Sequence, residues 1–175
     1  MSPEAASRLA SVEPPYVLDP IGQVRHDHPD DVLKDQWHSL TTLIEIRPDL
    51  EDGLLEIDGF SHLIVLFWMH QLEQELRSKL QVQPRGLLRM GLTREDLPTI
   101  GVFACDAPPR PNPIGLTVVE LLGRDGPTLE VRGLDAYSGT PVLDVKPYTS
   151  DRLVPDLKES GWHADLIRKT GARRV

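Results

Sequence analysis

A proline-rich segment in the middle of the chain carries the first side chains whose types could do chemistry. Residues 106–113 hold four prolines in eight positions, and each proline fixes φ and removes a backbone donor. Such a corner holds Arg110 and Asn112 at low entropic cost, and Gly115 after it lets the backbone approach a ligand closely. Arg110 suits bidentate binding of a carboxylate or phosphate, and Asn112 suits a hydrogen bond to an amine or a base edge. The alternative is a rigid structural corner with Arg110 in a surface ion pair.

Polar side chains also alternate along residues 141–148. Asp144, Lys146 and Tyr148 would share one face of a strand, with apolar side chains on the other face. Three polar groups on one face predict the wall of a pocket. The alternative is a solvent-facing strand whose Asp–Lys pair contributes little to stability.

Two histidines, His62 and His70, bracket the most apolar segment of the chain. The sequence has no His-Glu-x-x-His motif and no second histidine cluster, so we expect no metal site. Cys105, the single cysteine, is a candidate nucleophile beside either histidine, although a lone thiol is more often inert packing.

Composition limits the class of protein. A chain of 175 residues suits one domain with its own core, and a single cysteine excludes an intramolecular disulfide and fits a reducing cytosol. The first residues lack the basic-then-apolar pattern of a secretion signal, and the apolar run 63–69 is far shorter than the roughly 20 residues that span a bilayer. We therefore expect a soluble, cytoplasmic protein without a membrane partner.

The net charge of −8 disfavours a protein that coats nucleic acid in general, because phosphate binding draws on Lys and Arg. It leaves room for a local basic patch around residues 85–94 or at the C-terminus, residues 168–174. Both groups are equally consistent with solvated surface.

The elements that must position these side chains are mostly strands. Alternating residues predict strands at 41–46, 128–134 and 141–148, a run of consecutive apolar residues predicts one at 62–70, and further strands are expected at 21–24, 100–105 and 116–122. The apolar strand at 62–70 suits burial on both faces. Leucines at four-residue spacing predict an amphipathic helix at 72–82, and the tail predicts another helix at 154–158, with Trp162 packed back on the body.

Many short strands with Gly- and Pro-rich turns predict a mostly β fold, a small closed or nearly closed β-barrel with one or two short helices. We expect a flexible N-terminal arm at 1–16, the barrel domain at 17–150 and a C-terminal tail at 151–175 that packs on the barrel. No Gly-x-Gly-x-x-Gly follows a strand, which argues against a Rossmann-type cofactor site.

Three blocks of the sequence resemble the signature of the TsaA-like family, called TrmO in bacteria, and the chain is closer to its short branch. The blocks are GFSHLIVLFWMHQ at 59–71, GVFA at 101–104 followed by RPNPIGLTVVEL at 110–121, and GLDAYSGTPVLDVKPY at 133–148. With IGQVR at 21–25, which fits the opening strand of the family, they span most of the chain.

The resemblance implies a small β-barrel that acts as a homodimer and binds S-adenosylmethionine without a Rossmann fold. It implies methylation of N6-threonylcarbamoyladenosine at the N6 nitrogen, next to the anticodon of a threonine tRNA. Matching the family's motifs to this sequence gives the expected cofactor contacts: His70, Gln71, Leu116, Asp135, Ala136, Tyr137 and Ser138.

One departure from the family pattern concerns the cofactor. Asp106 stands where the family usually has an arginine that contacts the cofactor, so Arg110 is the candidate to hold the methionine carboxylate in its place. For the reaction, an acceptor aimed at the N6 amine would help most as charge develops in the transition state. From residue type we expect Asn112 or Asp144 in that role, with Lys146 and Tyr148 orienting it.

Two alternatives remain open at this point. The acceptor could be a small molecule instead of tRNA, which the acidic balance and Asp106 favour, or the chain could be a non-catalytic module that binds S-adenosylmethionine.

Overall fold

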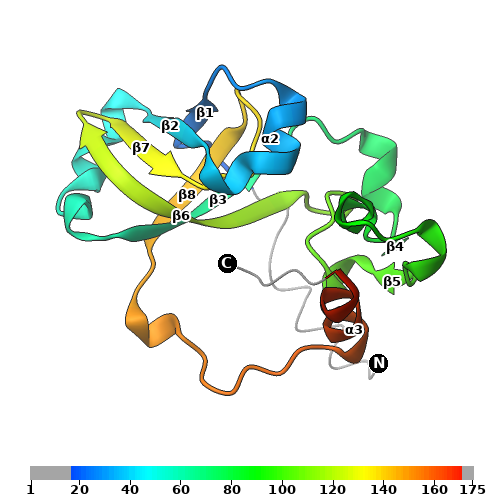
Figure 1. The fold of residues 1–175 in the computed structure, drawn as a ribbon. Coiled ribbons are helices and arrows are strands. Elements are labelled where there is room, and N and C mark those ends of the chain that lie inside the picture. Colours follow the sequence, from blue (N-terminus) through cyan, green and yellow to red (C-terminus); the bar gives the residue numbers. More distant parts are fainter. Residues whose placement is uncertain (1–16, 171–175) are drawn as a thin grey trace, which may run out of the picture.

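Six antiparallel strands close into a barrel in the order β1-β2-β7-β6-β3-β8 (Figure 1), in a computed structural model that describes residues 17–170. The barrel strands are β1 (Gly22–Arg25), β2 (Thr41–Ile46), β3 (His62–Trp68), β6 (Ile114–Asp125), β7 (Thr128–Arg132) and β8 (Pro141–Pro147). The predicted closed β-barrel is confirmed. The predicted arm at 1–16 lies outside the described residues.

Strand β3 pairs with β6 along one edge and with β8 along the other. Its inward side chains, Leu63, Val65 and Phe67, are at most 5% exposed. On the outer face Ile64 is 9% exposed, while Leu66 is only half-buried. The expected burial on both faces therefore holds for the first half of the strand only.

The inner faces of the strands form one apolar core. Burying each such side chain stabilises the fold by about 1.5–3 kcal/mol relative to exposure. The core comprises Val24, Ile44, Ile46, Leu54, Leu63, Val65, Phe67, Val119, Leu129, Val131, Leu134, Ala136 and Val142.

A smaller lobe is inserted between β3 and β6. It contains a two-stranded sheet of β4 (Gln81–Val82) and β5 (Ile100–Gly101), together with short 3-10 helices at Gln74–Ser78, Arg85–Met90, Arg94–Asp96 and Val102–Ala104. Further 3-10 helices lie at Trp37–Ser39, Pro48–Leu54, Ile57–Gly59 and Ser150–Arg152.

Two predictions for this lobe are wrong. The helix expected at 72–82 is a 3-10 turn followed by β4, and Leu80, which should lie on its apolar face, is 60% exposed. The strand expected at 100–105 ends at Gly101. Beyond it, the carbonyls of Val102 and Cys105 accept hydrogen bonds from the Arg110 guanidinium, so the chain turns towards the proline-rich corner.

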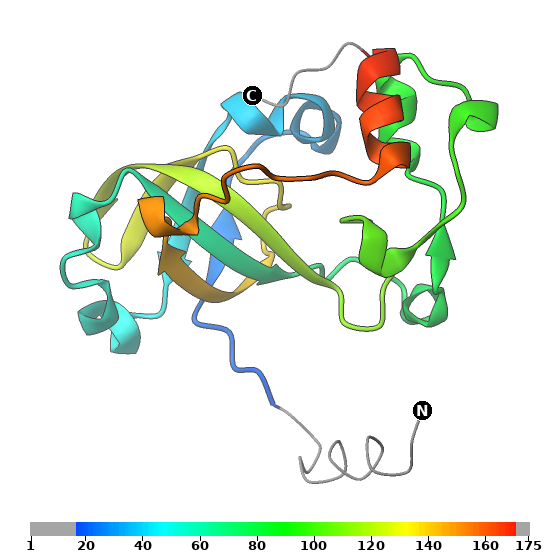
Figure 2. The same cartoon turned by 90° about the horizontal axis from the view of Figure 1, so that it is seen from below.

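Two α-helices complete the described fold, α2 (Asp30–Gln36) and α3 (Gly161–Thr170). The helix expected at 154–158 is wrong, because Pro155 lacks the N–H that a helix interior needs and the regular helix begins later. Helix α3 lies beside the small lobe in both views (Figures 1 and 2), where Lys169 Nζ is 2.9 Å from Asp96 Oδ1. Trp162 on this helix is half-buried, and packing of the tail on the barrel itself stays a prediction.

None of the helices in residues 17–170 combines the length and the apolar character that crossing a membrane requires.

Candidate functional site

A cavity of about 450 Å³ opens at the end of the barrel where β3 ends and β6 begins. Its walls come from the segment after β3, the proline-rich corner, the start of β6 and the turn before β8. It gathers seven of the eight residues expected to contact the cofactor: His70, Gln71, Arg110, Leu116, Asp135, Ala136 and Tyr137. Segments far apart in sequence thus meet in one space large enough for a small molecule.

Strand pairing fixes the two main walls relative to each other. Trp68 lies opposite Ile114 in the β3–β6 ladder, and the pairing continues past the strand because Met69 N donates to Pro113 O at 2.8 Å. Phe67 lies opposite Gly115, where a Cβ atom would stand 2.3 Å from the phenyl ring. This position therefore needs glycine for close packing against the Phe67 ring, whereas the sequence suggested glycine there for close approach to a ligand.

The turn before β8 is tied to the end of β3. Thr140 Oγ1 lies 3.2 Å from Nδ1 of His70, and Thr140 is 2% exposed. This buried hydroxyl orients the imidazole at the cavity wall.

His26, which sequence reasoning missed, also holds this turn through hydrogen bonds. His28 N donates to His26 Nδ1 at 3.2 Å, so Nε2 carries the proton and donates to the Ala136 carbonyl at 3.1 Å. The backbone N–H of His26 donates to Ser138 Oγ at 3.2 Å. Ser138 is not among the residues that line the cavity, and it acts by holding the turn. The sequence signal was the His-Asp-His run at 26–28, directly after the first strand.

Acidic and basic groups both line the cavity. Protein atoms crowd the Asp135 carboxyl and raise its pKa above the usual value, although water reaches it from the open side, and the Arg89 guanidinium offsets part of this effect. Arg89 also donates to the Lys34 carbonyl at 2.9 Å, and the Lys34 ammonium lies 5.9 Å from the centre of the Tyr137 ring. Helix α2 thus supports the Asp135–Tyr137 part of the turn.

Arg110 both fixes the proline-rich corner and leaves one donor without a partner among the described residues. Its Nη2 donates to the carbonyls of Val102 at 2.7 Å and Cys105 at 2.5 Å, which fixes the corner through main-chain contacts and not through the surface ion pair that was the alternative. Its Nε is buried without a hydrogen-bond partner among the described residues. A buried donor without a partner costs about 1–3 kcal/mol, so an acceptor bound in the cavity would relieve it.

Four predicted residues lie away from this cavity: Asn112, Asp144, Lys146 and Tyr148. Asn112 is exposed on the corner. Asp144 and Lys146 lie opposite Leu66 and Ile64 on the outer face of the barrel and form an ion pair of 2.5 Å, with side chains 45% and 50% exposed. The solvent-facing alternative describes this strand correctly.

The antiparallel pairing of β3 and β8 explains the correction. Tyr148 N donates to His62 O, so Tyr148 lies at the opposite end of β3 from His70. At a rise of about 3.3 Å per residue, that separation is roughly 25 Å. None of residues 141–148 lines this cavity, which reaches only Thr140 just before β8, so the pocket wall predicted along 141–148 is corrected to the turn before it.

The donor set fits S-adenosylmethionine, which carries a carboxylate, an ammonium group, a cationic sulfonium and a flat adenine. Arg110 offers a guanidinium with an unused buried donor to the ligand carboxylate. Asp106 and Asp135 offer negatively charged carboxylates to the ammonium group and the sulfonium. Phe67 and Leu116 supply apolar surface for the adenine. No group of three or more His, Cys, Asp or Glu within residues 17–170 could hold a metal ion.

Comparison with known proteins identifies the family of the chain. Residues 25–152 match the family model of the tRNA-methyltransferase O N-terminal domain. A probable S-adenosyl-L-methionine-binding protein of Archaeoglobus fulgidus is 51% identical over 135 residues, which cover 77% of this chain and 34% of that protein. The tRNA (adenine(37)-N6)-methyltransferase of Rattus norvegicus is 39% identical over 121 residues, covering 69% of this chain and 26% of that protein.

The fold has a solved counterpart. A crystal structure of TrmO from Pseudomonas aeruginosa superposes with a TM-score of 0.63 at 27% identity, over 84% of this chain and 62% of that one. The chain thus spans about a third of the length of its Archaeoglobus relative and less than two thirds of the TrmO chain. The family model covers most of the barrel and both walls of the cavity, and the chain belongs to the tRNA-methyltransferase O N-terminal domain family.

Proposed function

We propose that this chain is an S-adenosylmethionine-dependent methyltransferase that acts on the N6 nitrogen of threonylcarbamoyladenosine in tRNA. The observation that carries the proposal is the cavity at the end of β3, which gathers seven residues chosen from sequence motifs, among them Arg110 and Asp135. Relatives named as S-adenosyl-L-methionine-binding proteins and as a tRNA (adenine(37)-N6)-methyltransferase support the cofactor and the acceptor.

The residues of the cavity would bind and orient, which is most of what an in-line displacement requires of a protein. S-adenosylmethionine, when bound, supplies an electrophilic methyl group. Arg110 holds its carboxylate, and Asp135 attracts its cationic part at close range. His70, fixed by Thr140, and Gln71 orient the nucleoside end from the other wall.

The proposal includes a homodimer and a place in the cytoplasm, where tRNA is modified. On the outer face of β6, Leu116 is 61% and Val118 is 40% exposed, next to the half-buried Leu66 of β3. Such an apolar strip suits contact with a second copy of the chain.

The test is methyl transfer to tRNA with and without the modified base. The purified protein, with deuterium-labelled S-adenosylmethionine, should add a labelled methyl group to threonylcarbamoyladenosine in tRNA from cells that make that base. It should leave tRNA from cells that lack the base unlabelled. Nucleoside mass spectrometry reads both outcomes, and equal labelling of the two tRNA pools would disprove the proposed acceptor.

A second function is favoured by the name of the Archaeoglobus relative, which is a probable binding protein. In that case the chain binds S-adenosylmethionine without transferring its methyl group. Micromolar binding by calorimetry, together with no transfer to tRNA or to small nucleosides, would select this function over the enzyme.

A further inference from the structure

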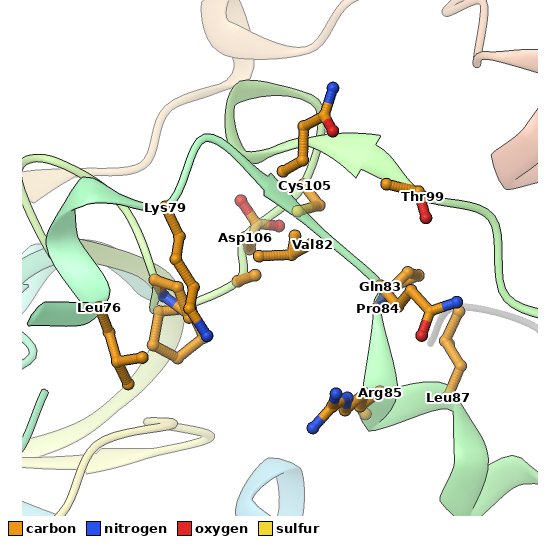
Figure 3. Close-up of a pocket in the computed structure, with 15 residues that line it drawn as sticks. Leu76, Lys79, Val82, Gln83, Pro84, Arg85, Leu87, Thr99, Cys105 and Asp106 are labelled. Atoms are coloured by element: carbon orange, nitrogen blue, oxygen red, sulfur yellow. The ribbon is translucent and has the colours of Figure 1, made fainter. Parts of the chain in front are cut away.

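A second cavity, of about 810 Å³, lies in the small lobe (Figure 3). It is lined by segments around β4 and β5 and by residues 105–109 of the corner. Asp106 and Pro108 line both cavities, so the two spaces adjoin at the proline-rich corner.

The larger cavity carries an excess of positive charge. Lys79 and Arg85 line it, from the segments before and after β4 (Figure 3). Asp106 is the acidic residue on its wall. This local excess contrasts with the net charge of −8 of the chain, so it singles out this surface for an anionic ligand.

The two cations are available to a ligand. Both side chains are exposed, and neither is held in an ion pair or a hydrogen bond by another residue in the described range 17–170. By contrast, Arg89 pairs with Asp35, and Lys169 pairs with Asp96. Gln83 is half-buried at the same wall, and its amide Nε2 donates to the Leu97 carbonyl at 3.2 Å, which fixes the lobe behind the two cations.

We propose that this second cavity binds the methyl acceptor, with Lys79 and Arg85 holding an anionic group of a modified nucleoside. The inference rests on the proposed function, because an acceptor must reach the first cavity, and the shared wall at Asp106 is where the two ligands can meet. The anion is a carboxylate on the base substituent or a phosphate of the backbone. An ammonium and a guanidinium on the walls of one cavity suit either of them.

The test compares the double variant Lys79→Ala/Arg85→Ala with the control Arg152→Ala/Lys158→Ala, which removes the same charge from exposed sites outside both cavities. Calorimetry with free threonylcarbamoyladenosine probes the carboxylate, and calorimetry with adenosine 5′-monophosphate probes the phosphate. The cavity variant should lose about tenfold or more in affinity for at least one of these ligands, since charge-assisted hydrogen bonds are removed. Its affinity for S-adenosylmethionine should stay within about twofold of the wild type, because the first cavity is intact.

The outcomes separate this inference from the proposed function. Loss of nucleoside binding in the cavity variant, with no tRNA methylation by the wild type, would keep the binding site and reject the enzyme. Methylation by the wild type, with equal KM for tRNA in both double variants, would reject the binding site and keep the enzyme. Equal nucleoside affinity in the wild type and the cavity variant, or no nucleoside binding by the wild type, overturns the inference.

Discussion

At the scale of single residues, Arg110 links the fold to the site. Its Nη2 bonds to two carbonyls of the small lobe, and its buried Nε has no partner in the described part of the chain. We expect Arg110→Ala to lower the free energy of unfolding by about 1–3 kcal/mol, because two partly buried carbonyls lose a charged donor. We also expect it to weaken S-adenosylmethionine binding by about tenfold or more.

Urea unfolding and calorimetry measure the two effects of Arg110→Ala. Asn112→Ala is the matched control on the same corner, since Asn112 is exposed and lies outside the cavity. It should change stability by less than about 0.5 kcal/mol. A control that weakens binding as much as Arg110→Ala would contradict the assignment of Arg110.

Asp135 gives a prediction about pH. Crowding raises the pKa of its carboxyl above the ordinary value of 3.8, so the folded state binds the proton more tightly than the unfolded chain does. Stability therefore falls as pH rises through the range between 3.8 and the raised pKa, and the deficit persists at neutral pH. Asp135→Asn should raise the Tm at pH 7, leave it nearly unchanged at pH 3, and weaken S-adenosylmethionine binding.

Thermal melts at the two pH values, with calorimetry at pH 7, test the Asp135 prediction. A variant that is less stable than the wild type at pH 7 would show that the carboxylate stabilises the fold. Unchanged affinity would remove Asp135 from the binding site.

Residue types predicted part of the site, and the reasons are physical. Motif matching placed His70 and the turn at 135–138 at one site, and the structure brings all but Ser138 to the cavity wall. His26 was missed because its role depends on a tautomer and on a contact across more than a hundred residues with Ala136. Asp144 was misplaced because alternation predicts which side chains share a face of a strand but not whether that face lines a cavity or meets solvent.

At the scale of elements, the pairing of β3 with β6 sets the width of the site. Gly115→Ala would place a Cβ atom 2.3 Å from the Phe67 ring, so the ring must move towards the cavity or the core. We expect a loss of about 1–3 kcal/mol in the free energy of unfolding, the usual cost of overpacking. Gly123→Ala in the same strand is the matched control, since no atom lies within 4 Å of its added Cβ.

A second substitution sharpens the Gly115 experiment. Replacing the ring in Phe67→Leu/Gly115→Ala should recover part of the stability lost by Gly115→Ala, because the two sites are in contact and their effects do not add. Denaturant midpoints of the wild type, Gly115→Ala, Phe67→Leu and the double variant measure this coupling. Equal losses in Gly115→Ala and Gly123→Ala would show that the close packing with Phe67 is unimportant.

Local pattern predicted the barrel strands better than the helices. The strand at 41–46 has the predicted bounds, because alternating β-branched residues and a proline at 48 leave little choice. The helix expected at 154–158 failed at Pro155, and the helix expected at 72–82 failed because the segment ends as a short 3-10 helix and then pairs with β5 as a strand. Element length in the lobe is set by tertiary contacts such as those of Arg110.

At the scale of the whole molecule, an apolar strip on the outer face of the barrel carries the prediction of a dimer. Val118 is 40% exposed opposite Ile64 on that face and does not line either cavity. We expect the wild type to have the mass of a dimer in light scattering and Val118→Lys to have the mass of a monomer, because a buried unpaired charge opposes association. A monomeric wild type would reject the dimer, and a dimeric Val118→Lys would place the interface elsewhere.

The two cavities differ in the charges of the side chains that line them. The first cavity combines Asp106, Asp135 and Arg110, which suits a ligand of mixed charge, whereas Lys79 and Arg85 make the second one basic. An acidic chain can thus bind an anionic acceptor through a local patch while it repels nucleic acid elsewhere.

The most direct test of the account is a crystal structure of the protein with S-adenosylhomocysteine, the product form of the methyl donor. The account predicts the ligand in the cavity at the end of β3, its carboxylate within hydrogen-bond distance of Arg110 and its nucleoside between His70 and the turn that carries Asp135. A ligand bound in the larger cavity, or one that touches neither Arg110 nor that turn, would contradict it.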